Sequence, residues 1–126
     1  MAITLTTAAR NAACDAIVDL VDVGTTDANG DIVFMTSGSV EVATLALAAP
    51  AFGASSDGVA TANAVANDTN ATGGTVALFK IQNKDNTEIF RGAVTVSSGD
   101  INLSSLVVGA TDTVSMSSLT VTMPAS

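Results

Sequence analysis

The sequence predicts a mainly β protein, an antiparallel β-sandwich or jelly roll with one N-terminal α-helix. One segment near the N-terminus places its apolar residues at helical spacing, whereas the apolar residues after Gly24 follow strand-like patterns. Turn signals then recur about every 8–12 residues, as is typical of sandwiches. A chain of 126 residues has the length of one domain. We therefore expect a single domain over residues 1–126, with a helix at about 8–22, a sandwich at about 31–123 and short terminal arms.

The segment 8–22 carries the strong helical signal of this chain. Thr6 or Thr7 can cap its start, and Gly24 can end it. Its apolar side consists of Ala9, Ala13, Ala16, Ile17, Leu20 and Val21, and its polar side of Asn11, Asp15, Asp19 and Asp22. Two of these aspartates lie in the last turns, where the helix dipole disfavours negative charge. We therefore expect the acidic face to be solvated or to meet a basic partner.

The rest of the chain reads as short strands separated by turns. We expect strands at 32–35, 40–48, 59–65, 75–82, 87–96, 103–108 and 113–123. Polar and Gly-containing turns are expected at 27–31 and 83–86. Within the last segment the apolar residues change parity at Ser117–Ser118, which predicts a bulge or bend where the chain passes from one sheet to another.

Composition and charge point away from several classes of function. The chain has no His, Trp or Tyr, one Cys, and 4 Lys+Arg against 12 Asp+Glu, for a net charge of −8. Direct binding to nucleic acid or to an anionic membrane is not expected, because both need clustered basic residues. No apolar run is long enough to span a membrane, and residues 1–20 do not resemble a secretory signal. We expect a structural protein, not an enzyme, with no cofactor and no metal.

Few residues are candidates for a catalytic or binding site. Cys14 lacks a His to serve as its base, so we interpret it as a packed core residue. The segment 27–31 resembles part of a calcium loop but lacks the closing Glu, so we interpret it as a plain turn. In the tetrapeptide 50–53 we interpret Phe52 as a core anchor; presentation of its ring to a partner is the alternative.

Three stretches resemble a family of small tailed-bacteriophage virion proteins. They are ITLTTAARNAACDAIVDLVD at 3–22, PAFG at 50–53 with GVATA at 58–62, and LTVTMPA at 119–125. The resemblance spans most of the chain in order, and the N-terminal helix is its most specific part. Residues 67–96 match mainly in character.

The resemblance implies a capsid decoration, or cement, protein with a jelly-roll-like fold. Such a protein would bind the outside of the capsid and bridge subunits of the major capsid protein, as a dimer or trimer, after synthesis in the host bacterial cytoplasm. A tail or fibre-associated virion protein that acts in host attachment is the alternative. For partner contacts we select two terminal groups and the acidic helix face: Ile3, Leu5, Asp15, Asp19, Asp22, Val121, Met123 and Pro124.

Overall fold

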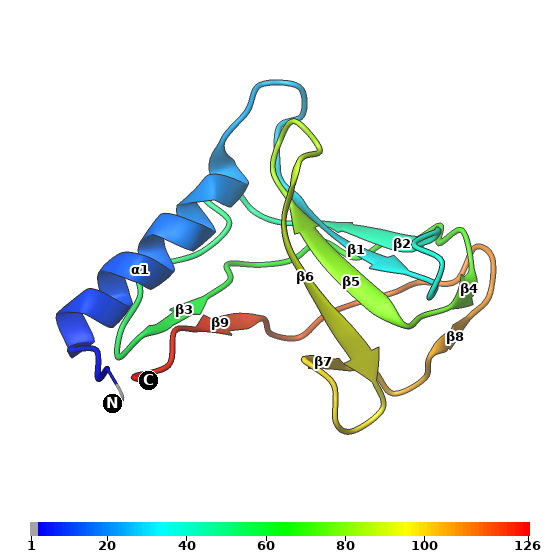
Figure 1. The fold of residues 1–126 in the computed structure, drawn as a ribbon. Helices are drawn as coiled ribbons and strands as arrows, with labels where there is room; N and C mark the ends of the chain where they lie inside the picture. The colour runs from blue at the N-terminus through cyan, green and yellow to red at the C-terminus, as the bar shows by residue number, and fades with distance from the viewer. Residues whose placement is uncertain (1–2) are drawn as a thin grey trace.

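The structure is a computed structural model that describes residues 3–126, and it is mainly β with one N-terminal helix (Figure 1). Helix α1 spans Thr7–Asp19 and continues into the 3-10 turn η1, Leu20–Asp22. The strands are β1 Asp31–Met35, β2 Glu41–Ala46, β3 Val59–Thr61, β4 Gly74–Thr75, β5 Leu78–Gln82, β6 Glu88–Thr95, β7 Ile101–Asn102, β8 Val107–Val108 and β9 Thr120–Thr122. The predicted fold class is confirmed: a curled, mostly antiparallel sheet is backed by less regular segments.

The main sheet has the strand order β2-β1-β5-β6-β7. Its four long strands pair antiparallel, and the short edge strand β7 pairs parallel to the end of β6. The register places Phe34 of β1 opposite Phe79 of β5, and Ile32 opposite Ile81. These four apolar side chains are buried, so the strands follow the hydrophobic alternation of the sequence.

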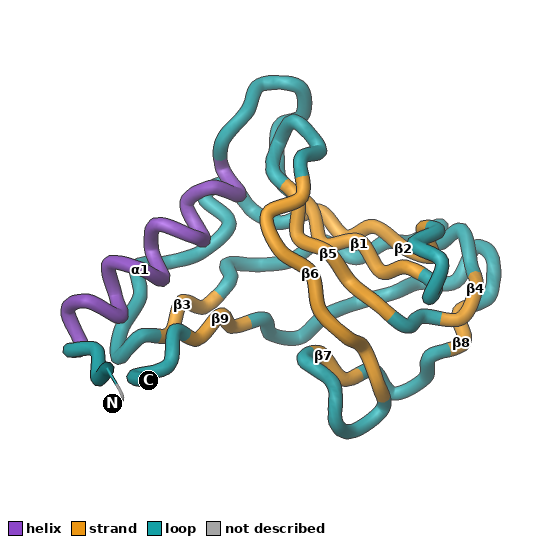
Figure 2. The backbone as a smooth tube through the Cα atoms, in the orientation of Figure 1, coloured by secondary structure: helices purple, strands orange, loops and turns teal. Residues whose placement is uncertain are grey.

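The second layer is assembled from two short ribbons and the helix. Strand β3 pairs with β9, and β4 pairs with β8, both antiparallel. Helix α1 lies along the β3–β9 ribbon, and the two chain ends meet beside it (Figure 2). This layer is less regular than the full second sheet of a jelly roll.

Local signals begin and end the helix as the sequence predicts, but the predicted apolar side is wrong in part. Ala9, Ala16 and Leu20 are exposed, and the side chains that the helix buries are Cys14, Val18 and, in η1, Val21. The Thr6 side chain accepts from the Ala9 amide at 3.2 Å and forms the N-terminal cap. Helical structure ends at Asp22, and Gly24 follows at φ +118°. A Cβ at Gly24 would lie 2.7 Å from Asp85 Cγ, so the close approach of the 83–86 turn requires glycine here.

One hydrophobic core joins the two layers. The helix contributes Cys14, Val18 and Val21, which lie against sheet residues such as Phe34 and Leu45. Phe52 is 6% exposed within this cluster, so its predicted role as a core anchor is confirmed. Cys14 is fully buried, as predicted, and its thiol approaches the Val121 carbonyl at 3.4 Å.

Three predicted strands are much shorter than expected. Of 59–65 only Val59–Thr61 is a strand, 103–108 retains only β8, and 113–123 retains only β9. The first strand ends early because the backbone changes partner after Ala62: the Asn63 amide donates to the Ala51 carbonyl. Residues 66–73 then cover the open edge of β2 through separate hydrogen bonds. Ala66 N–H donates to the Ala46 carbonyl, Gly73 N–H to Val42, and the Asp68 carboxylate accepts from Thr44 N–H. The predicted bend is confirmed at Ser117, between the bridge at Val114 and β9.

Candidate interaction surface

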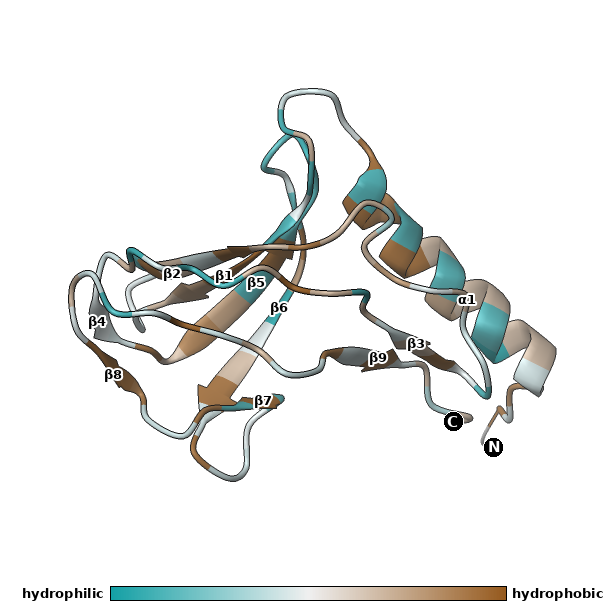
Figure 3. Ribbon diagram, turned by 180° about the vertical axis from the view of Figure 1, so that it is seen from behind, coloured by the Kyte–Doolittle hydropathy of each residue, from teal (hydrophilic) through white to brown (hydrophobic). Residues whose placement is uncertain are grey.

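The polar side of α1 binds a loop of its own chain. Asn11 Oδ1 accepts from the Gly58 amide at 2.7 Å, Asp15 Oδ1 from the Ser55 amide at 2.8 Å, and Asp22 Oδ1 from the Ala51 amide at 3.0 Å. Figure 3 shows hydrophilic positions recurring along α1; Asn11 and Asp15 are polar residues of α1, and Asp22 ends the following turn η1. These three side chains therefore supply hydrogen-bond acceptors to the irregular segment 51–58, whose part-buried amides would otherwise lack partners.

This arrangement corrects one prediction about the acidic face. The expectation of a wholly solvated or partner-facing face is wrong for Asp15 and Asp22, because both are partly buried and bonded within the chain. The negative charge of Asp22 near the helix C-terminus is stabilised by the backbone amide of Ala51. Asp19 is exposed, so it alone of the three aspartates has the predicted solvated character.

The two terminal segments lie together at one end of the molecule, as Figure 1 shows. The Leu5 amide donates to the Ala125 carbonyl at 2.7 Å, and Arg10 Nε donates to the Met123 carbonyl at 2.9 Å. The Met123 amide in turn donates to Gly58. Gly58 is buried at φ +76°, and a Cβ there would lie 2.7 Å from both the guanidinium and the Met123 carbonyl. The terminal segments are thus docked on the body of the single chain.

The selected contact residues divide into two groups in space. The termini bring Ile3, Leu5, Met123 and Pro124 to the same end, where Ile3 is 74% exposed and Pro124 is exposed. Val121 is partly buried in β9, beneath the helix. The aspartates lie along the helix, apart from this end. Sequence reasoning treated Arg10 only as one of four scattered basic residues and missed its part in fixing the C-terminal strand.

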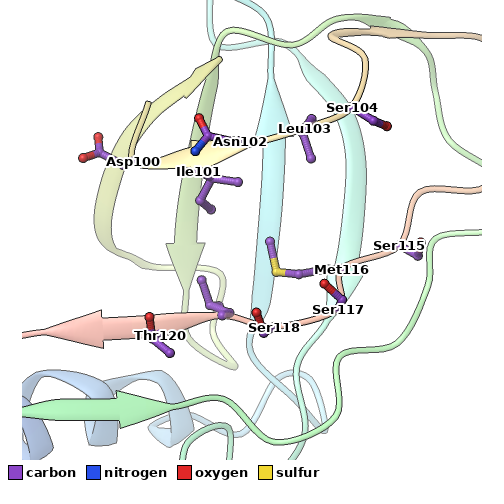
Figure 4. Close-up of a pocket in the computed structure, with 11 residues that line it drawn as sticks. Asp100, Ile101, Asn102, Leu103, Ser104, Ser115, Met116, Ser117, Ser118 and Thr120 are labelled. Carbon is purple, nitrogen blue, oxygen red and sulfur yellow. The ribbon is translucent and has the colours of Figure 1, made fainter. Parts of the chain in front are cut away.

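A groove that the sequence did not reveal runs between two sheet edges. One wall is β7 with the chain that follows it, and the other is residues 112–118 with β9 (Figure 4). The central part, of about 400 Å³, is lined by 100–104 and 115–120; it shares residues with adjoining hollows of about 200 and 460 Å³. Ile101 and Leu103 point from one wall toward Met116 on the other. These three side chains form an apolar centre in a groove whose lining is otherwise mostly polar.

Three acidic side chains have shifted pKa values, and each shift has a local cause. Backbone amides of Thr25 and Thr26, at 2.9 and 3.0 Å, lower the pKa of Asp85. The hydrogen-bonded Arg91 guanidinium, 2.7 Å away, lowers the pKa of Glu88. Partial burial raises the pKa of Asp31. All three shifts arise from packing and pairing within the fold.

Comparison of this chain with family models, curated proteins and solved structures finds no match.

The described residues limit the kinds of site that this surface can hold. Residues 3–126 contain no group of three or more His, Cys, Asp or Glu side chains placed to hold a metal ion. No helix in the described range is long and apolar enough to cross a membrane. The one salt bridge within that range joins Arg91 to Glu88. The other features of this surface are its acidic side chains, the two docked terminal segments and the open groove.

Proposed function

We propose that this chain is a structural protein of a phage virion that binds the outside of the capsid and cements the shell by bridging major capsid protein subunits. The observation that carries the proposal is the excess of acidic over basic residues on a densely hydrogen-bonded body. Arg10 binds a carbonyl of its own chain and Arg91 pairs with Glu88, which leaves 11 of the 12 carboxylates opposite two lysines without a salt bridge among the described residues. Such a surface favours a partner with a basic face.

The architecture suits a cementing role in a second respect. Both termini are hydrogen-bonded to the body, and irregular segments such as 51–58 are held by side-chain acceptors. A shell protein must hold its shape while load passes between the subunits it joins. Many modest contacts repeated by symmetry then add up to strong attachment, and a dimer or trimer at a shell axis would provide that repetition.

The proposal is tested by counting the chain in purified particles of the phage that encodes it. Quantitative mass spectrometry measures its molar ratio to the major capsid protein. We expect a simple fraction set by shell symmetry. A few copies per particle would instead assign the chain to the tail or a fibre, in host attachment, and its absence would overturn the virion proposal.

Attachment is tested separately with particles that lack the chain. Purified protein is added to them, and co-sedimentation is followed at increasing salt concentration. Because the proposed contact joins an acidic surface to a basic one, bound protein should decrease as salt screens the charges. Failure to sediment with the particles at any salt concentration would contradict the proposal.

A further inference from the structure

The groove between residues 100–108 and 112–122 has two unpaired sheet edges as its walls. Strand β7 is the last strand of the main sheet, and β9 pairs only with β3. Edge strands present rows of unpaired N–H and C=O groups that can pair with another chain. Unlike the open edge of β2, which residues 66–73 cover, these two edges border a hollow.

The hydrogen bonds of β9 identify which backbone groups are free. The Ala62 amide donates to the Leu119 carbonyl, and the Met123 amide donates to the Gly58 carbonyl. Because paired and unpaired positions alternate along an antiparallel ribbon, Thr120 and Thr122 direct their N–H and C=O groups away from β3. The free edge of β9 therefore offers the two hydrogen-bonding positions at Thr120 and Thr122.

The same edge continues through residues 115–118. None of these four residues makes a hydrogen bond to any other residue in the described part of the chain, through backbone or side chain. Ser115, Ser117 and Ser118 are exposed, whereas Met116 is half-buried in the groove. Residues 115–122 thus offer free hydrogen-bonding groups on both sides of the bend at Ser117, and the straight part after the bend, 118–122, is about 16 Å long at strand spacing.

The charges of the groove restrict its occupant. The walls 100–108 and 112–120 contain two charged residues, Asp100 and Asp112, and both are acidic. Arg91, farther along beside β9, is occupied by Glu88. Ile101, Leu103 and Met116 place apolar side chains at the centre of the groove, whose lining is otherwise mostly polar. An extended segment that alternates apolar residues with a Lys or Arg would match both properties.

We propose that this groove receives an extended, Lys- or Arg-bearing segment of the capsid shell protein, which adds as a strand along residues 115–122. The inference rests on the function proposed above and specifies where the shell protein is bound. Backbone pairing supplies affinity and does not require a particular sequence in the bound segment. The apolar side chains at the centre of the groove select the register of that segment, and the two aspartates select its charge.

The decisive variant is Ser118→Pro, with Ser118→Ala as its matched control. Ser118 has the same parity along the chain as Thr120 and Thr122, is exposed and makes no hydrogen bond in the described residues, so proline removes an unpaired amide from the proposed binding edge, whereas alanine removes only the hydroxyl. The fold of each variant is checked by its ¹H–¹⁵N spectrum. We expect Ser118→Pro to bind particles that lack the chain roughly tenfold more weakly than the wild type, and Ser118→Ala to bind like the wild type.

A second pair of variants tests charge without relying on proline. Asp100→Asn with Asp112→Asn removes both groove charges and keeps the oxygens that accept from Ala93 and Gly109. Asp19→Asn with Asp57→Asn removes two exposed charges outside the groove. We expect the groove pair to weaken particle binding and to reduce its salt dependence more than the control pair does.

Hydrogen exchange locates the contact directly. Amides of 115–118, 120 and 122 should exchange rapidly in the free protein and become protected on the particle. Particle binding without this protection, or with full affinity in Ser118→Pro, would overturn the inference and leave the capsid proposal standing. If Ser118→Pro instead abolished self-association and left particle binding intact, the groove would belong to a second copy, and the inference would be overturned.

A peptide probe separates failure of the inference from failure of the capsid proposal. The probe is acetyl-Lys-Val-Thr-Val-Thr-Val-Lys-amide, and its control replaces both Lys by Glu. Should the protein not bind particles, shifts of the 115–122 amide signals with the Lys peptide alone would support the groove while the capsid proposal falls. The absence of both particle binding and peptide shifts would overturn the groove as well.

Discussion

Individual carboxylates carry out different tasks in this fold, and their pKa shifts differ in sign. Burial raises the pKa of Asp31, so its charged form destabilises the fold at neutral pH. The carboxylate of Asp85 instead accepts from the amides of Thr25 and Thr26, which lowers its pKa and joins the 83–86 turn to the end of the helical segment. Stability from such a group is present above its ordinary pKa of 3.8 and is lost as the pH falls through the folded value.

We therefore expect Asp85→Asn to flatten the acid dependence of stability. Asparagine keeps an acceptor oxygen for Thr25 but cannot titrate, so the unfolding free energy of the variant should fall less steeply below pH 3.8 than that of the wild type. Urea unfolding at a series of pH values measures both slopes. Glu88, whose pKa is also lowered, titrates in both proteins and serves as the internal reference. Equal slopes would contradict the role given to Asp85.

Gly24 is the residue at which backbone conformation and packing impose the strictest requirement. Its φ is +118°, and a Cβ would lie 2.7 to 2.8 Å from atoms of Asp85, including the backbone nitrogen. We expect Gly24→Ala to destabilise the protein by about 1–3 kcal/mol. In Gly38→Ala the new Cβ would meet only Thr36 Oγ1, at 3.8 Å, so this control should be neutral or slightly stabilising. Thermal unfolding compares the two; similar melting temperatures would contradict the argument.

At the scale of elements, α1 organises a loop as well as a core. Its apolar side buries Cys14 and Val18, while its polar side presents Asn11, Asp15 and Asp22 to the amides of 51–58. A segment without regular structure must obtain its hydrogen bonds from elsewhere, and here the helix supplies them. This explains why an acidic row on a helix can be structural.

We expect Asp15→Ala to cost about 1–3 kcal/mol of stability, because it leaves the part-buried Ser55 amide without an acceptor. Asp19→Ala, on the exposed side of the same helix, should change stability by less than about 0.5 kcal/mol. Both remove one aspartate from α1, so helix propensity and net charge change alike. Urea denaturation gives the difference, and an equal cost for the two variants would show that the loop contact contributes nothing.

At the scale of the whole molecule, the C-terminal strand belongs to the body. Leu119 is 8% exposed in the common core, β9 completes the ribbon with β3, and Arg10 fixes the Met123 carbonyl. A chain that ends at Ser118 loses all three interactions. The total stability of a domain is about 5–15 kcal/mol, and loss of one buried leucine costs about 2–5 kcal/mol.

We therefore expect the chain ending at Ser118 to lose its cooperative thermal transition. The control ends at Pro124, which removes the Ala125 carbonyl bonded to the Leu5 amide and should cost about 1 kcal/mol. Circular dichroism during heating distinguishes the two. A sharp transition at the wild-type temperature for the chain ending at Ser118 would mean that β9 is dispensable.

The sequence predicts the elements whose signals are local. Helix α1 with its Thr6 cap and the β5–β6 hairpin around 83–86 follow from periodicity and turn chemistry, as does the burial of Phe52. The short strands β7 to β9 could not be delimited, because segments that mix apolar residues with Ser and Thr form strands only where a partner edge lies beside them.

The groove and the terminal contacts depend on distant parts of the chain. The two walls of the groove, around Ile101 and Met116, become neighbours only after the sheet curls and the chain bends at Ser117. Likewise, Arg10 meets the Met123 carbonyl across 113 positions, and no local pattern marks the pair. For the candidate surface, sequence reasoning identified the terminal residues but assigned the acidic helix face to solvent or a partner where most of it binds the chain itself.

The meeting of the two ends makes the polypeptide a nearly closed ring. With Leu5 hydrogen-bonded to Ala125, a short linker could join the termini, and new ends could be opened at the exposed 84–87 turn without removing any residue from the core. A cargo protein fused at either end of these 126 residues would leave the body at the same place. The fold is thus suited to circular permutation and to fusion with a second protein at either terminus.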